Sequence, residues 1–227
     1  MCPFFLLFCP GYFTYERQKY CIYSLLLIYG TYFMEQIVSE GLINSVMAKE
    51  AFVTESRKKL IDLACLMVVT LRQGGKILIF GNGGSAADAQ HMAAEFVNRF
   101  LINRRPLAAV ALSTDTSIIT SIGNDFSFDE IFSKQVQALG KPEDLALGIS
   151  TSGSSMNVIK GIEVAKEIGM RTAVLTGGIA GDGGELGRIS DIFLNVPTAK
   201  TQHIQEVHLW VEHLLCEIVE REIFGEE

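Results

Sequence analysis

Two predicted helices each carry a pair of polar side chains whose spacing would let both members act on one ligand. His91 and Glu95 are four residues apart, so a helix presents both on one face, about 6 Å apart. Gln205 and His213 are eight residues apart, which is about 80° around a helix, and both can reach one cavity. His208 points about 140° away from His213 and is a weaker candidate. An imidazole and a carboxylate can bind a divalent metal or act as an acid/base pair, although a single histidine is more often structural.

Two loops have the composition of anion-binding turns. Residues 81–85 read GNGGS, and their glycines allow backbone N–H groups to approach a ligand at the start of the next helix. Residues 150–155 read STSGSS, and their five hydroxyls could donate hydrogen bonds to phosphate oxygens without a Lys or Arg. The first loop lacks both the GxGxxG pattern and the GK[ST] ending, so neither a dinucleotide nor ATP is indicated.

Each loop also has a purely structural interpretation. The glycine loop could be a tight strand-to-helix turn with Ser85 as the N-cap of the helix. The serine loop could be a capping turn in which the hydroxyls bind only the helix backbone. Two such loops in one domain favour a phosphosugar site over two unrelated caps.

The elements around these loops alternate between strand and helix. Short apolar runs predict strands, and 3.6-residue periodicity predicts helices. Such an order predicts an α/β fold, a doubly wound parallel five-stranded sheet flanked by helices, with an N-terminal helix pair and with ligands beyond the carboxyl ends of the strands. The predicted strands are 76–80, 108–112, 144–149, 172–175 and 192–196, and the predicted helices are 35–53, 55–73, 86–100, 115–122, 127–139, 155–168 and 202–224.

Composition excludes several classes of protein. The chain has 227 residues, of which 48% are hydrophobic and 20% charged, so it is long enough for one α/β domain and is not disordered. Its formal net charge of −7 argues against a general nucleic-acid binder. Five cysteines without a CxxC pair indicate neither a disulfide framework nor a structural zinc site, which favours a reduced, cytoplasmic setting.

Residues 1–33 differ from the rest of the chain. They hold all six tyrosines, five of the 14 phenylalanines and three of the five cysteines. A signal peptide is disfavoured because no basic segment precedes the first apolar run. A membrane anchor would rest on the 14-residue apolar run that ends at Phe33, which is short for a span of about 20 residues. The remaining interpretation, a mis-assigned start with translation beginning at Met34, is preferred here and makes residues 34–227 a single domain.

Taken together, the motifs resemble the SIS (sugar isomerase) family. Within it they are most similar to the subfamily that isomerises a seven-carbon ketose phosphate, from about residue 35 to residue 224. The residues that carry the resemblance are 81–85 (GNGGS), 123–125 (GND), 148–155 (GISTSGSS), 175–177 (LTG) and 204–208 (IQEVH).

The resemblance implies a role for each matching residue. The phosphate would lie on Ser150, Thr151, Ser152 and Ser155, while Asn82, Gly83, Gly84, Glu95, Asn124, Asp125 and Gln205 would complete substrate binding. One zinc ion per site would be held by His91, Glu95, Gln205 and His213. Glu95 and His213 would be the catalytic acid/base pair, in roles that could be exchanged. The family also implies a homotetramer with sites shared between subunits. His203 matches no role, and residues 1–33 match nothing in the family.

The implied reaction converts sedoheptulose 7-phosphate into D-glycero-D-manno-heptose 7-phosphate through an enediol, in the synthesis of bacterial lipopolysaccharide precursors. A base must take a carbon-bound proton, an acid must serve the oxygens, and zinc could polarise the carbonyl. One alternative is a non-catalytic SIS protein that binds the replication initiator, which would lack counterparts of Glu95 and His213. Another is an enzyme of the family that acts on a different phosphosugar.

Overall fold

A parallel sheet of five strands forms the centre of the fold. This computed structural model describes the backbone of residues 15–225 and the side chains of residues 30–225. All neighbouring strands are parallel, in the order β2-β1-β3-β4-β5. The predicted doubly wound α/β fold is therefore confirmed. The strands are β1 (Ile77–Gly81), β2 (Ala109–Ala111), β3 (Leu145–Ile149), β4 (Arg171–Gly177) and β5 (Ile192–Val196).

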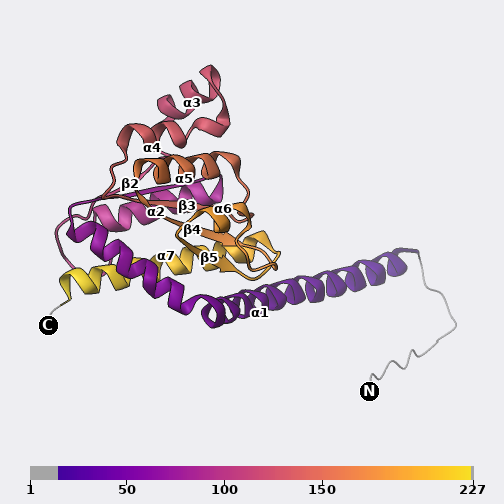
Figure 1. Ribbon diagram of the computed structural model, residues 1–227. Coiled ribbons are helices and arrows are strands. Elements are labelled where there is room, and N and C mark those ends of the chain that lie inside the picture. The colour runs from indigo at the N-terminus through magenta and orange to yellow at the C-terminus, as the bar shows by residue number, and fades with distance from the viewer. Residues whose placement is uncertain (1–14, 226–227) are drawn as a thin grey trace. The chain divides into compact units, whose positions relative to one another are not determined.

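Helices cover both faces of this sheet (Figure 1). One face packs against α2 (Gly84–Val97), α7 (Thr201–Phe224) and the C-terminal part of α1 (Tyr15–Arg72). The other face packs against α3 (Thr116–Asp125), α4 (Ser133–Leu139), α5 (Met156–Ile168) and α6 (Gly184–Ile189), with a 3₁₀ turn η1 (Phe128–Glu130) between α3 and α4. Along β1, Ile77 and Ile79 enter the first core, and Leu78 and Phe80 enter the second. This alternation explains why every residue of β1 is buried and apolar.

The N-terminal helix pair expected from the sequence is wrong, because α1 is a single helix of 58 residues. Thr54 stands where a break was expected. Its hydroxyl donates to the carbonyl oxygen of Glu50, 2.9 Å away, and the helix continues through it. Helix α1 ends at Arg72, just before Gly74, whose positive φ of 84° turns the chain toward β1. The short α6 was missed because two of its six residues are glycine.

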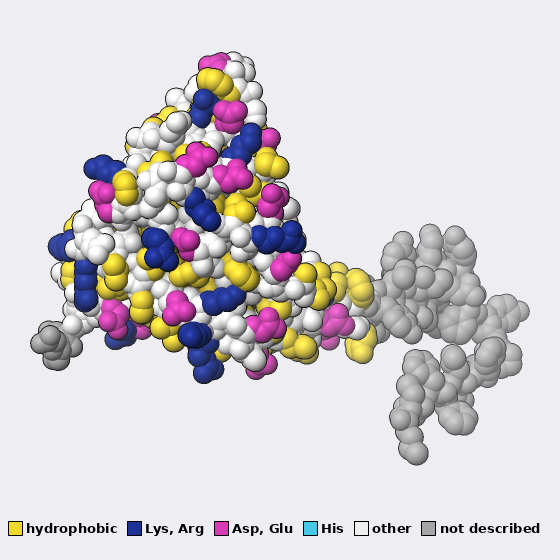
Figure 2. Space-filling model, viewed as in Figure 1, with side chains coloured by type: hydrophobic (Ala, Val, Ile, Leu, Met, Phe, Trp, Pro, Cys, Tyr) yellow, Lys and Arg dark blue, Asp and Glu magenta, His cyan; other side chains and the backbone are white. Residues whose placement is uncertain are grey.

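The chain divides into two compact units, residues 1–44 and 45–227, and the second contains the whole sheet. In the first unit, α1 exposes large apolar side chains (Figure 2), among them Tyr32, Phe33, Ile37, Val38 and Leu42. Among the described residues, no helix has a stretch both long enough and apolar enough to cross a bilayer. Residues 1–14 lie outside the described residues, so the interpretation of residues 1–33 stays a prediction.

Candidate active site

The two predicted loops lie side by side at the carboxyl edge of the sheet. Gly81, the last residue of β1, is in register with Ile149, the last residue of β3. Gly83 then has φ 57° and ψ −120°, a backbone conformation that favours glycine, and it forms the N-cap of α2. Ser85 is the second residue of that helix, so its interpretation as the N-cap is wrong.

The hydroxyls of the serine loop contact one another. The Oγ atom of Ser150 lies 2.9 Å from that of Ser155 and 3.4 Å from that of Ser152. The Ser154 hydroxyl donates to Ser152 Oγ across 2.9 Å. Ser155 occupies the N-cap position of α5, yet its side chain makes no capping hydrogen bond. The capping interpretation therefore fails, and these hydroxyl hydrogens can turn toward an anion at the positive end of α5.

A second glycine-rich segment holds the serine loop in place. Gly153 has φ +65°, and a side chain there would collide with the backbone of Gly183. Its carbonyl oxygen accepts a hydrogen bond of 3.0 Å from the backbone N–H of Leu186 in α6. Only glycine fits this contact, which joins the serine loop to the segment before α6.

Asn82, a predicted substrate-binding residue, also has a partner within the protein, and its contact with substrate stays a prediction. Its side-chain amide forms a reciprocal pair with that of Asn157 in α5, with N···O distances of 2.8 and 2.9 Å. Because Asn157 is buried, the pair links the glycine loop firmly to the helix that follows the serine loop. Sequence reasoning missed Asn157. The one available signal was an amide side chain in the first turn of a helix that directly follows a predicted binding loop.

The predicted acid/base and metal residues meet between α2 and α7. His91 Nε2 lies 2.9 Å from His213 Nε2 and 3.8 Å from Glu95 Oε1. Gln205 lies at the first turn of α2, where a Cβ added to Gly84 would be 2.6 Å from its Nε2 atom. The spacing on two separate helices therefore brings all four residues to one face of α2.

The donor types of this cluster are those that zinc takes in proteins, namely imidazole nitrogen and carboxylate oxygen. The near approach of two Nε2 atoms and one carboxylate is also what a shared cation would require. Within the described residues, however, no three His, Cys, Asp or Glu side chains are grouped tightly enough to hold a metal ion. Gln205, the fourth predicted ligand, is not among those residue types.

The two remaining histidines are structural. His208 is buried, and its Nε2 atom lies 3.0 Å from the carbonyl oxygen of Thr176. Burial lowers the pKa of His208 to about 4, against the opposing effect of that hydrogen bond, so the ring is neutral. His203 Nδ1 lies 3.0 Å from Glu206 Oε2. Hydrogen bonds from His203 and Ser45 lower the pKa of Glu206. The bond from Ser45 joins α1 to α7, and His203 holds the Glu206 carboxylate from within α7, a role that the sequence did not suggest.

Two carboxyl groups, one half-buried and one buried, lie close to the histidine pair. Asp88 Oδ2 in α2 and both carboxyl oxygens of Glu212 in α7 have no hydrogen-bond partner among the described residues. Burial raises the pKa of Glu212 to about 9, and the negative charge of Asp88 adds to this effect. Burial also raises the pKa of Asp88, partly offset by His91. Sequence reasoning missed this pair, although a glutamate within the apolar periodicity of the last helix was a signal.

The described structure does not join Asn124 and Asp125 to the two loops. Both are exposed at the C-terminal end of α3, and Asn124 Nδ2 donates to Asp125 Oδ1 across 2.8 Å. No residue of α3 is buried. Their predicted contact with substrate stays a prediction.

Comparison with known proteins identifies the family of this chain. The SIS domain family model matches residues 43–177. The phosphoheptose isomerase of Nitratidesulfovibrio vulgaris strain Hildenborough is 50% identical over 189 residues, covering 83% of this chain and 89% of its own. That of Aquifex aeolicus is 49% identical over 78% of this chain and 91% of its own. The solved phosphoheptose isomerase from Neisseria gonorrhoeae is 44% identical with a TM-score of 0.77, and the match covers 82% of this chain and 98% of that one. The chain therefore belongs to the SIS domain family and, within it, to the phosphoheptose isomerases.

Proposed function

We propose that this chain isomerises sedoheptulose 7-phosphate to D-glycero-D-manno-heptose 7-phosphate, in the heptose branch of lipopolysaccharide precursor synthesis. The observation that carries the proposal is the meeting of His91, Glu95 and His213 between α2 and α7, in a chain about 50% identical to phosphoheptose isomerases. The serine hydroxyl cluster at the same edge of the sheet supplies the phosphate site that such a substrate requires.

Substrate binding would begin at the phosphate. The hydroxyls of Ser150, Thr151, Ser152 and Ser155 would donate hydrogen bonds to its oxygens, helped by the N-terminus of α5. Because no Lys or Arg is needed in that loop, recognition would depend on its hydroxyl hydrogen bonds more than on net charge. The sugar chain would then extend toward α2, along the backbone of Gly83 and Gly84 and past Gln205. Asn82, paired with Asn157, would keep the glycine loop in position for this contact.

Proton transfer would fall to Glu95 and His213. Removal of a proton beside the carbonyl needs a base at one carbon, and the enediol needs an acid at the oxygens. Glu95 would move the proton between C1 and C2, and His213 would exchange protons with the oxygens. Both lie beside His91, which places acid and base within one substrate's reach.

We propose zinc as the cofactor, held by His91, Glu95, Gln205 and His213. A divalent cation bound there would polarise the substrate carbonyl and stabilise negative charge on oxygen. The support is the donor chemistry of these side chains and their approach to one another.

We also propose a cytoplasmic homotetramer with sites completed by neighbouring subunits. Residues 32–47 of α1 expose nine large apolar side chains, and a group of exposed apolar residues is typical of a protein–protein contact. Helix α3, with exposed Phe126 beyond its end, offers Asn124 and Asp125 to a second chain. Sedimentation velocity would test the assembly. A monomer at micromolar concentration would contradict it.

The testing experiment is an isomerase assay on the full chain with sedoheptulose 7-phosphate, with added zinc and with a chelator. We expect conversion to the aldoheptose 7-phosphate that the chelator removes and zinc restores. Glu95→Gln is the matched inactive control. Conversion unaffected by the chelator would contradict the zinc proposal alone. No conversion by the folded, zinc-loaded protein would contradict the isomerase proposal and favour another phosphosugar or a regulatory binding role.

A further inference from the structure

The segment that follows α2 is fastened to α7 by one buried ion pair. Arg104 Nε lies 2.9 Å from Glu220 Oε1, and the two side chains are 2% and 1% exposed. The same carboxylate accepts hydrogen bonds from three consecutive backbone N–H groups, those of Phe100 (3.0 Å), Leu101 (2.6 Å) and Ile102 (2.8 Å). Glu220 therefore holds the backbone of this segment in place and also neutralises the charge of Arg104.

Arg104 also binds the C-terminal end of α2, from which this segment starts. Its guanidinium donates to four backbone carbonyl oxygens, including that of Glu95 at 2.8 Å and that of Phe96 at 2.7 Å. Glu95 is the proposed base, so the ion pair is linked directly to the backbone that carries it. We call Arg104 and Glu220 the clasp.

The ring of Phe100, at the start of this segment, lies on the ring of His213. The two rings are stacked, with centroids 5.6 Å apart and an angle of 18° between their planes. Glu220 lies seven residues after His213 in α7, so both project from nearly the same face of that helix. The ring of His91 approaches His213 edge-on, with centroids 5.1 Å apart and an angle of 71°. The imidazole of His213 is thus bounded by two rings.

We infer that Phe100 is a positioning residue for His213 and that the Arg104–Glu220 clasp holds Phe100 in that position. This inference rests on the proposed function for its kinetic consequence. An imidazole turns about two side-chain bonds, and a flat ring stacked on it leaves one orientation favoured. A misplaced catalytic group slows the chemical step, while phosphate binding on the serine loop does not depend on Phe100.

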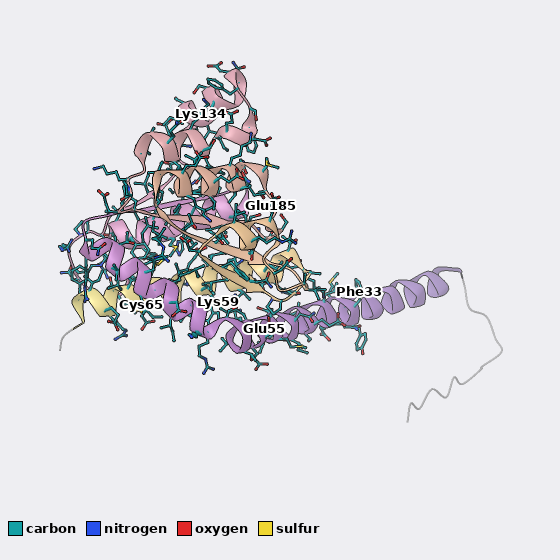
Figure 3. All side chains as sticks on the ribbon, in the orientation of Figure 1. Phe33, Glu55, Lys59, Cys65, Lys134 and Glu185 are labelled. Carbon is teal, nitrogen blue, oxygen red and sulfur yellow. The ribbon has the colours of Figure 1, made fainter. Side chains whose placement is uncertain are left out.

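The test compares Phe100→Leu with Phe100→Tyr. Leucine keeps apolar bulk but has no flat face, whereas tyrosine keeps the ring, and half-buried Phe100 leaves room for a hydroxyl to reach solvent. We expect Phe100→Leu to lower kcat about tenfold or more with KM within about twofold of wild type. We expect Phe100→Tyr to keep kcat within about threefold. The matched control is Phe193→Leu, at a half-buried ring on the edge strand β5 that packs against Lys59 (labelled in Figure 3).

An NMR readout makes the test independent of activity. Stacking places the carbon-bound protons of the His213 ring in the shielding region of Phe100. We expect these resonances to move downfield in Phe100→Leu and to stay near their wild-type positions in Phe100→Tyr and Phe193→Leu. An inactive wild type would refute the proposed function, and the NMR comparison would still decide the inference. Unchanged His213 resonances in Phe100→Leu would overturn it, as would wild-type kcat in Phe100→Leu or equal losses of kcat in Phe100→Leu and Phe100→Tyr.

Discussion

Replacing Glu220 by leucine is the sharpest test of the stability argument. The change removes a carboxylate that is 1% exposed and accepts four hydrogen bonds, from the backbone N–H groups of residues 100–102 and from Arg104 Nε. It leaves a buried guanidinium without its counter-ion and three N–H groups without their acceptor. Removal of one partner of a buried pair costs about 3–5 kcal/mol. The free energy of unfolding should fall by that amount.

Urea unfolding, followed by far-UV circular dichroism and by fluorescence of the single tryptophan, measures this loss. With a slope of about 2 kcal/mol per molar urea, the midpoint should fall by about 2 M. All variants are compared at one protein concentration, because any assembly would couple stability to concentration. The matched control is Glu217→Leu, one turn earlier on α7, where an exposed i,i+4 pair with Arg221 is worth at most about 0.5 kcal/mol.

A double-mutant cycle completes this test. Arg104→Met alone should also destabilise, because it leaves the Glu220 carboxylate buried without a cation. The double variant Arg104→Met/Glu220→Leu should lose about 1–3 kcal/mol less than the two single losses combined, since neither charge remains unpaired. Equal, small effects of Glu220→Leu and Glu217→Leu, or additive single losses, would refute the assignment of the clasp.

Three further outcomes follow from the site and its surroundings. Glu95→Gln should lower kcat by about a thousandfold or more while circular dichroism stays that of a folded protein; near-normal turnover would contradict the acid/base assignment. Ser152→Ala should raise KM about tenfold with kcat little changed, since one hydrogen bond to the phosphate anion is lost; unfolding instead would favour a structural role. Because burial lowers the pKa of His208 to about 4, wild type should lose about 3 kcal/mol of stability from this group as pH falls from 6.5 to 4. His208→Gln should remove that part of the pH dependence, and an unchanged difference between the two proteins across this range would refute it.

Local sequence patterns predicted much of the site because the relevant spacings are local. Gln205 and His213 lie on one helix, as do His91 and Glu95, and helix geometry alone puts each pair on a shared face. The two loops follow parallel strands, and the carboxyl ends of parallel strands meet at one edge. Those two rules were enough to predict that the loops and the helical pairs serve one site.

Local sequence patterns did not predict features that depend on residues far apart in the chain. Thr54 has a low helix propensity, but α1 continues through it and packs Phe52 and Leu60 on either side into the first core. The side chain of Asn82 pairs with that of Asn157, 75 residues away, a contact that no local pattern indicates. Glu212 stands out in the sequence only as a glutamate within the apolar periodicity of the last helix; its raised pKa could not be read from that pattern, because desolvation depends on what surrounds a group in space.

The sequence by itself determined the alternation of strand and helix, the positions of the two candidate ligand loops and the residue types of the proposed acid/base pair, since each depends on periodicity or on composition within one element. Only the tertiary structure decided that His213 faces His91 across two helices, that Phe100 stacks on His213, and that Glu220 binds three backbone N–H groups more than 110 residues away. The physical reason is that packing and desolvation depend on which residues are neighbours in space. The fold brings these neighbours together from distant parts of the chain.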